Sequence, residues 1–173
     1  MKIQLSGIEW ESIVDGPGIR VVLFGQGCPH RCKGCHNQET WDPRGGTPWQ
    51  TSHLIDKILM QKMIKGVTFS GGEPFFQAFA FSLVGETLKK EGLDIVTYTG
   101  YTFEEIMTVQ GKNKDVRHLM ECTDYLIDGP FILEQRDLNL PLRGSTNQRI
   151  IDVKQSRDKG SVIEVDGLGS MTV

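Results

Sequence analysis

Three cysteines of this chain lie close together in the segment 28–35. They are Cys28, Cys32 and Cys35, and their spacing is C-x3-C-x2-C. Thiolates this close together can share one compact metal centre. A [4Fe-4S] cluster ordinarily uses four cysteines, so three would leave one iron open to a ligand from outside the protein. Because a free coordination position distinguishes catalytic metal sites from closed structural ones, the triplet predicts a reactive iron–sulfur cluster.

Two other metal sites are compatible with these residues. Zinc bound by three cysteines and a histidine would use His30 or His36 as its fourth ligand, although zinc sites usually carry two separated ligand pairs. A ferredoxin-like cluster would need Cys122 as a fourth thiolate. Cys122 stands far from the triplet in sequence. An isolated cysteine of this kind is more often a small buried hydrophobic residue than a ligand.

A second group of chemically suggestive residues is Gly71-Gly72-Glu73-Pro74, which follows an apolar segment. Without a Cβ atom, Gly71 and Gly72 allow the backbone to approach a ligand closely. On its own, such a segment is equally typical of an ordinary turn from strand to helix.

Composition limits the class of protein. The chain has 173 residues, which is the size of one domain, and a formal net charge of −3. It has no overall positive field to attract nucleic acid, and no apolar run approaches the length of a membrane span. Four cysteines, three of them clustered, do not form the dispersed pattern of a secreted disulfide framework. We therefore expect a cytoplasmic protein without nucleic-acid or membrane partners.

The elements that position these residues follow an alternating pattern. Four apolar, β-branched segments predict strands over 19–24, 66–70, 94–99 and 124–128. Helical spacing of apolar residues predicts helices over 54–63 and 76–88, and Thr102 with Glu105 has the spacing of a capping box. Strands alternating with helices indicate a mostly parallel sheet. The loops at Cys28, Gly71, Gly100 and Gly129 should then meet at its carboxyl edge.

The fold class expected is α/β. A full eight-unit barrel takes about 250 residues, so this shorter chain predicts an open, partial (β/α) barrel, truncated relative to a complete one.

The cysteine triplet together with the GGEP segment resembles the radical S-adenosylmethionine superfamily. The resemblance implies a [4Fe-4S] cluster on Cys28, Cys32 and Cys35, with S-adenosylmethionine bound to the remaining iron. The positions that it implies for contact with this cofactor are Gly34, Cys35, His36, Gly71, Gly72, Glu73, Thr99 and Asp128. The chain departs from the superfamily at Gly34, where an aromatic residue commonly stands near the adenine.

The segment Asp15–Arg20 ahead of the triplet narrows the resemblance to the glycyl-radical-enzyme activases. Four segments narrow it further within that group, and they are Cys28–Asn37, Tyr98–Thr102, Asp128–Phe131 and Arg143–Arg149. The resemblance implies reductive cleavage of S-adenosylmethionine and removal of hydrogen from a glycine Cα of a partner enzyme. The implied partner is anaerobic ribonucleoside-triphosphate reductase, with flavodoxin or ferredoxin as electron donor. The alternatives are another glycyl-radical enzyme, such as pyruvate formate-lyase, or a non-catalytic iron–sulfur or zinc module.

The resemblance covers residues 1–153, which we expect to form the radical S-adenosylmethionine domain. Residues 154–173 are expected to be a C-terminal tail, for which the sequence indicates no role.

Overall fold

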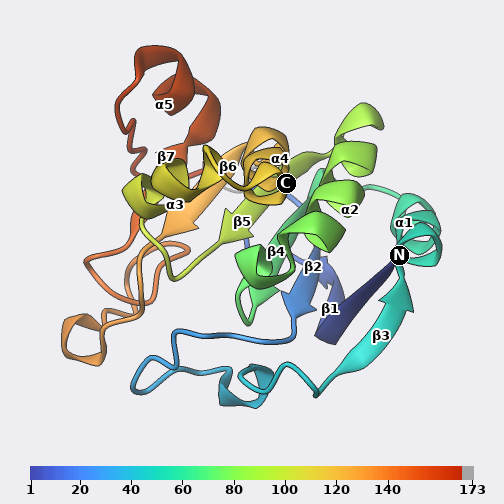
Figure 1. Ribbon diagram of the computed structural model, residues 1–173, viewed down its shortest axis with the longest axis horizontal. Helices are drawn as coiled ribbons and strands as arrows, with labels where there is room; N and C mark the ends of the chain where they lie inside the picture. The colour runs from blue at the N-terminus through green and yellow to red at the C-terminus, as the bar shows by residue number, and fades with distance from the viewer. Residues whose placement is uncertain (169–173) are drawn as a thin grey trace.

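A computed structural model describes residues 1–168 of the chain (Figure 1). Its centre is one seven-stranded sheet with the strand order β3-β1-β2-β4-β5-β6-β7. The strands are β1 (Lys2–Ser12), β2 (Arg20–Gly25), β3 (Thr47–Gln50), β4 (Gly66–Gly71), β5 (Asp94–Tyr98), β6 (Tyr125–Asp128) and β7 (Arg149–Asp152). The four predicted strands are β2, β4, β5 and β6, and they pair in parallel. The parallel pairing of these four strands is confirmed, but the sheet as a whole is mixed rather than mostly parallel, with three parallel and three antiparallel pairs.

The flanking strands are antiparallel to their neighbours and were not predicted. β1 pairs with both β2 and β3, and β7 pairs with β6. β3 and β7 stand at opposite ends of the strand order, so the sheet is open rather than closed into a barrel. The α/β class and the open sheet therefore agree with the expectation.

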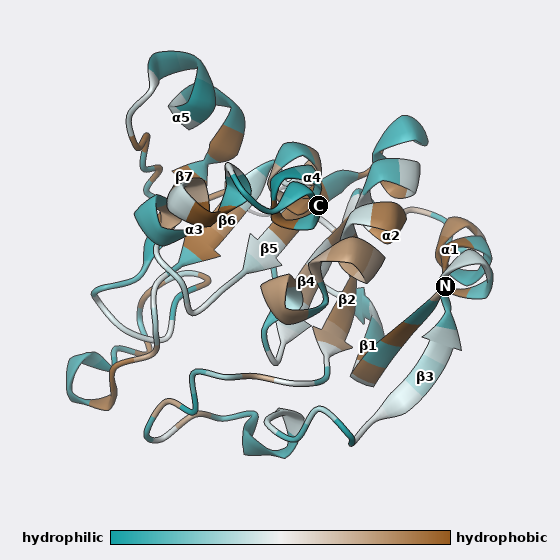
Figure 2. Ribbon diagram, in the orientation of Figure 1, coloured by the Kyte–Doolittle hydropathy of each residue, from teal (hydrophilic) through white to brown (hydrophobic). Residues whose placement is uncertain are grey.

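Helices pack against the sheet through a shared apolar core. They are α1 (Thr51–Leu59), α2 (Ala78–Lys90), α3 (Phe103–Gln110), α4 (Lys114–Cys122) and α5 (Val153–Lys159). Short 3-10 turns lie at η1 (Gln38–Thr40), η2 (Pro74–Gln77) and η3 (Leu133–Gln135). Alternate residues of β2 and β4, such as Leu23 and Phe69, join Phe81 and Val84 of α2 in the main core. Figure 2 shows these apolar segments where α2 and α4 lie over the strands.

Two details of the predicted helices are wrong. The first helix ends at Leu59, and Met63 beyond it is 82% exposed. In the second, Phe76 and Phe79 are 53% and 45% exposed, because the core-facing side of α2 begins with Ala78 and Ala80. The capping box at Thr102 is confirmed, with both of its hydrogen bonds present.

The residues after β7 continue the same structure. α5 begins at Val153, and the backbone amide of Val165 donates to the carbonyl of Ile150 at 2.8 Å. Val165 and Leu168 pack on a second apolar cluster of Val96, Ile127 and Ile150. The expected boundary after residue 153 thus falls within an element, and residues 169–173 of the expected tail lie outside the described residues. Over residues 1–168, none of the helices has the length and apolar character needed to cross a membrane.

Candidate functional site

The four loops that follow the parallel strands meet at one edge of the sheet, as predicted. The amide of Glu73 donates to the carbonyl of Gly27 at 2.9 Å, which joins the loop after β4 to the loop after β2. The amide of Gly129 donates to the carbonyl of Tyr101 at 2.9 Å, which joins the loops after β6 and β5. In Figure 1 these loops extend from the lower ends of the central strands.

The cysteine loop, residues 26–46, is closed at its base by main-chain and side-chain hydrogen bonds. The amide of Gly27 donates to the carbonyl of Thr40 at 2.7 Å. The side-chain amide of Gln26 donates to the carbonyls of Glu39 and Asp42 at 3.0 and 2.6 Å. These bonds bring the two ends of the loop together and leave the cysteines at its tip.

Each cysteine of the triplet carries a free, half-buried thiol. The amide of Cys35 donates to the carbonyl of Cys32 at 3.1 Å, and the amide of Asn37 donates to the Cys35 sulfur at 3.4 Å. Burial raises the pKa of the Cys28 thiol. Three free thiols on one loop, with a backbone amide already directed at one sulfur, are a donor set suited to an iron–sulfur cluster. Over residues 1–168, however, no three metal-ligating side chains already converge.

The alternative metal ligands, Cys122, His30 and His36, each make other contacts in the structure. Cys122 is 3% exposed at the end of α4, and its thiol donates to the Leu119 carbonyl at 3.2 Å. Burial raises its pKa to about 12. It is therefore a small hydrophobic residue of the core, as the sequence favoured. His30 contacts Glu73, and the ring of His36 lies edge-on to Phe131 at 6.0 Å between centroids.

Glu73 connects three of the four loops. Its carboxylate is buried, and it accepts hydrogen bonds from His30 at 2.8 Å, from the Thr99 hydroxyl at 3.0 and 3.1 Å, and from the amides of Phe75 and Gly100 at 3.0 and 2.9 Å. A buried carboxylate needs such partners to offset its lost hydration. Thr99, one of the positions expected to contact the cofactor, lies in this network. No pattern in the sequence indicates that His30 would join this network.

Gly71 and Gly72 are required by the packing of the chain itself. Gly71 has φ +87, and a Cβ on it would lie 2.6 Å from the Phe24 Cα. A Cβ on Gly72 would lie 2.5 Å from the carbonyl oxygen of Gly27. The missing side chains thus let the GGEP segment contact the start of the cysteine loop, backbone to backbone.

Asp128 lies in a different network. Its buried carboxylate accepts from the amide of Phe103 at 2.7 Å and forms a two-pronged ion pair with Arg149. Arg149 also binds both oxygens of Glu104, and these hydrogen bonds to Asp128 and Glu104 raise its pKa. In the sequence, Arg149 stands out only as the last residue of the Arg143–Arg149 motif. The antiparallel pairing of β7 with β6 brings it to Asp128.

The rest of the Arg143–Arg149 motif shapes the loop after β6, residues 129–148. The side chains of Asn147 and Gln148 donate to the carbonyls of Pro130 and Gly129 at 2.8 and 3.0 Å. This loop contacts the cysteine loop. The Leu133 side chain fills the space beside Gly34, and a Cβ built on Gly34 would lie 2.9 Å from the Leu133 Cδ1. Gly34 has φ +76, which also favours glycine.

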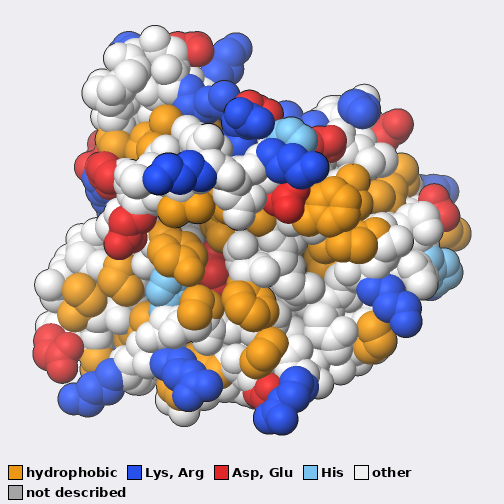
Figure 3. All heavy atoms as spheres, in the orientation of Figure 1, with side chains coloured by type: hydrophobic (Ala, Val, Ile, Leu, Met, Phe, Trp, Pro, Cys, Tyr) orange, Lys and Arg blue, Asp and Glu red, His pale blue; other side chains and the backbone are white. Residues whose placement is uncertain are grey.

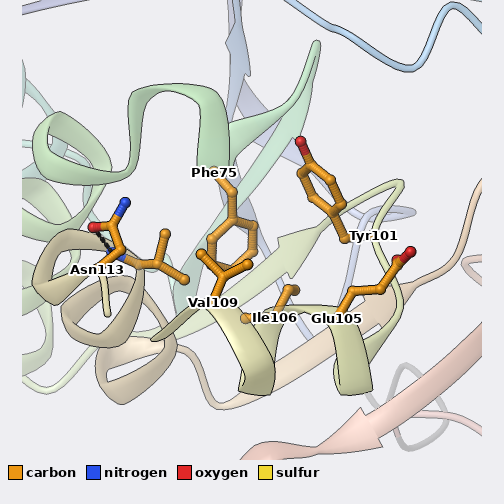
Figure 4. Close-up of a pocket in the computed structure, with 7 residues that line it drawn as sticks. Phe75, Tyr101, Glu105, Ile106, Val109 and Asn113 are labelled. Atoms are coloured by element: carbon orange, nitrogen blue, oxygen red, sulfur yellow. Dashed lines mark hydrogen bonds between the residues drawn. The ribbon is translucent and has the colours of Figure 1, made fainter. Parts of the chain in front are cut away.

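A pocket of about 240 Å³ lies beside the Glu73 network, on the α3 side (Figure 4). Phe75 and Tyr101 form one wall, and Ile106 and Val109 of α3 form another. The pocket is mostly apolar and contains none of the triplet cysteines. On the face drawn in Figure 3, Lys and Arg side chains are scattered among acidic ones rather than gathered into one basic patch.

Comparison with known proteins gives a consistent result. A family model described as a 4Fe-4S single cluster domain matches residues 14–151. The anaerobic ribonucleoside-triphosphate reductase-activating protein of Vibrio cholerae is 40% identical over 147 residues, which cover 80% of this chain and 90% of that protein. The protein of the same name in Haemophilus influenzae is 36% identical over 152 residues, with the same two shares. The pyruvate formate-lyase-activating enzyme of Clostridium pasteurianum is 38% identical over 113 residues, which cover 60% of this chain and 48% of that enzyme.

The chain combines an open α/β sheet with a three-cysteine loop at the carboxyl ends of the parallel strands. Together with the family match, these features define it as an iron–sulfur protein of the single-cluster class. The chain belongs to the 4Fe-4S single cluster domain family and, within it, to the family of anaerobic ribonucleoside-triphosphate reductase-activating proteins.

Proposed function

We propose that this protein activates anaerobic ribonucleoside-triphosphate reductase as a radical S-adenosylmethionine enzyme of the glycyl-radical-enzyme activase group. The observation that carries the proposal is the meeting of the cysteine loop with the GGEP and Gly100 loops at one sheet edge, in a chain 40% identical to a protein named for that activation. Carboxyl ends of parallel strands are where α/β ligand sites form.

The proposed cluster ligands are Cys28, Cys32 and Cys35. The proposed cofactor-binding residues are Gly34, Cys35, His36, Gly71, Gly72, Glu73, Thr99 and Asp128. When bound, the cluster and S-adenosylmethionine would together supply reductive cleavage of the cofactor and removal of hydrogen from a glycine Cα, which leaves a glycyl radical. The chain itself holds the three thiols on a loop closed at its base and places buried polar groups beside it.

The sheet is proposed to be the open partial barrel of the radical S-adenosylmethionine enzymes, and its open edges would let a polypeptide loop of the reductase approach from the side. Residues 1–153 would carry the chemistry, with residues 154–173 as a C-terminal tail to which no role is assigned. Flavodoxin or ferredoxin is the proposed electron donor, and the cytoplasm the proposed location. Nucleic acid and membrane are not expected partners.

The cluster is tested by anaerobic reconstitution with iron and sulfide. We expect close to one [4Fe-4S] cluster per chain, because three clustered free thiols are available. Replacing Cys28, Cys32 or Cys35 with Ala should abolish it. The matched control is Cys122→Ala, which removes a thiol buried in the helix layer and should leave the cluster intact. Stoichiometric zinc without sulfide, or loss of the cluster in the Cys122 variant, would contradict the proposal.

The activity is tested by mixing the reconstituted protein anaerobically with S-adenosylmethionine, a reductant and anaerobic ribonucleoside-triphosphate reductase. Electron paramagnetic resonance should then detect a glycyl radical on the reductase. The matched comparison is pyruvate formate-lyase under identical conditions, because an activating enzyme of that lyase is 38% identical over part of this chain. A radical formed on the lyase and not on the reductase would show that the protein activates pyruvate formate-lyase instead.

A further inference from the structure

His30 is the side chain through which the cysteine loop meets Glu73. Its Nε2 lies 2.8 Å from the Glu73 Oε2, and its side chain is 16% exposed. The ring also packs edge-on against Tyr101, with 4.4 Å between centroids. The neighbouring residues Arg31 and Lys33 are exposed. A residue between two of the triplet cysteines is therefore held in place from two directions.

Gly100 provides the space for the His30 ring. A Cβ at position 100 would lie 2.5 Å from the His30 Cδ2, 2.7 Å from its Nε2 and 2.8 Å from its Cγ. The φ of Gly100 is not in the left-handed region, so its backbone conformation alone does not demand glycine. We conclude that the glycine is needed here for space, and that His30 fills this space.

The other donors to Glu73 come from segments just after β4 and β5. They are the amide of Phe75, the hydroxyl of Thr99 and the amide of Gly100. These segments are fixed by the strands that precede them. The cysteine loop is longer and has little regular structure, so a side-chain bond to a buried carboxylate has a large effect on where its tip lies.

We propose that His30 is a positioning residue that fixes the tip of the cysteine loop against the GGEP and Gly100 loops. Glu73 binds the His30 ring, and Gly100 leaves the space that the ring fills. This inference deepens the proposed function, because a loop held in this way presents the three thiols at a defined place beside the proposed cofactor edge. His30 acts through Glu73 and is not itself assigned as a ligand of the cluster.

The first test uses the metal-free and cofactor-free protein. Trypsin can cut the cysteine loop after Arg31 and after Lys33, both exposed, so cleavage there reports how often the tip detaches. We expect His30→Ala to raise cleavage at these two bonds by about tenfold, the factor that corresponds to about 1.4 kcal/mol. His30→Gln keeps an N–H donor and should restore part of the protection. Gln38→Ala, a change at an exposed residue of the same loop, is the control and should leave cleavage within about twofold of the wild type.

The second test combines changes at positions 30 and 100. Gly100→Ala should raise cleavage in the wild-type background, because the new methyl group collides with the His30 ring. In the His30→Ala background the methyl group has room, so the same change should add no further cleavage. Gly111→Ala, where the nearest atom lies 4.0 Å away, is the matched control. If His30→Ala does not fold, the comparison of Gly100→Ala with Gly111→Ala decides the question.

A third readout separates positioning from general stability. In His30→Ala the initial rate of cluster assembly with iron and sulfide should fall in proportion to the lost occupancy of the held loop, by a smaller factor than the tenfold rise in cleavage, and His30→Gln should recover part of it. The midpoint of global thermal unfolding should change little, because detachment of the loop tip is a local opening that leaves the core packed. Wild-type cleavage and assembly rates in His30→Ala, or equal effects of Gly100→Ala in both backgrounds, would overturn the inference. A reductase that gains no glycyl radical would overturn the proposed function instead and leave the digestion results unchanged.

Discussion

At the scale of single residues, the polar groups at the sheet edge are occupied by the chain itself. Glu73 was expected to contact a cofactor, and in the structure its carboxylate already has donors on both oxygens. Asp128 is likewise paired with Arg149. Buried carboxylates without partners are costly, so these residues hold the loops together whatever else they bind.

Gly72 gives a prediction at this scale. Gly72→Ala would place a Cβ 2.5 Å from the Gly27 oxygen and 2.9 Å from the Gly25 oxygen, both of which are backbone atoms that cannot rotate away. We expect a loss of roughly 2–3 kcal/mol in the free energy of unfolding, measured by urea titration. The yield of reconstituted cluster should also fall, because Gly27 directly precedes Cys28.

The control for this change is Gly167→Ala, since position 167 is exposed and nothing lies within 4 Å of a Cβ there. That variant should keep the stability of the wild type to within about 0.5 kcal/mol. Wild-type stability and cluster yield in Gly72→Ala would show that the GGEP segment can move away from the cysteine loop at little cost.

At the scale of elements, the loop after β6 depends on β7. The start of β7 contributes Arg149, which binds Asp128 at the end of β6 and Glu104 near the start of α3. The amide of Phe103 donates to the same Asp128 carboxylate, so three elements meet at one charge pair. The Arg143–Arg149 motif is therefore a structural support of the loop after β6, which contacts Gly34 through Leu133.

Arg149→Ala tests this support. The change leaves the buried Asp128 carboxylate without its cation, and we expect a loss of roughly 2–4 kcal/mol in the free energy of unfolding. Arg157→Ala is the matched control, because it removes an arginine from the half-exposed pair with Glu121. A pair of that kind contributes about 0–1 kcal/mol. Equal losses in the two variants, measured by urea titration, would mean that the Asp128 pair is no more important than a surface pair.

At the scale of the whole molecule, the two faces of the sheet are covered differently. The main core lies under the helices, whereas the other face is covered by local segments. Arg20 is fully buried and binds the Thr68 hydroxyl, the Pro17 carbonyl and Asp94, so the turn before β2 packs against β4. Val165 and Leu168 cover the cluster around Ile127. The chemistry-bearing loops remain at one end of this layered structure.

The central parallel strands, the capped start of α3 and the position of four loops at one edge could all be predicted from the sequence. These features depend on local patterns: β-branched runs, capping residues, and the direction that parallel strands impose on the loops after them. The cysteine triplet was also readable, because its three members share one short segment. The core role of Cys122 agreed with the general behaviour of an isolated cysteine.

Which side chains meet could not be predicted from the sequence, because it depends on how the elements pack. His30 reaches Glu73 across 43 positions of sequence, and Arg149 reaches Asp128 through an antiparallel strand that the pattern did not reveal. The exposure of Phe76 and Phe79 likewise depends on where η2 passes into α2. Such pairings are set by strand order and by the space that glycines leave between loops, and neither is encoded in the periodicity of one segment.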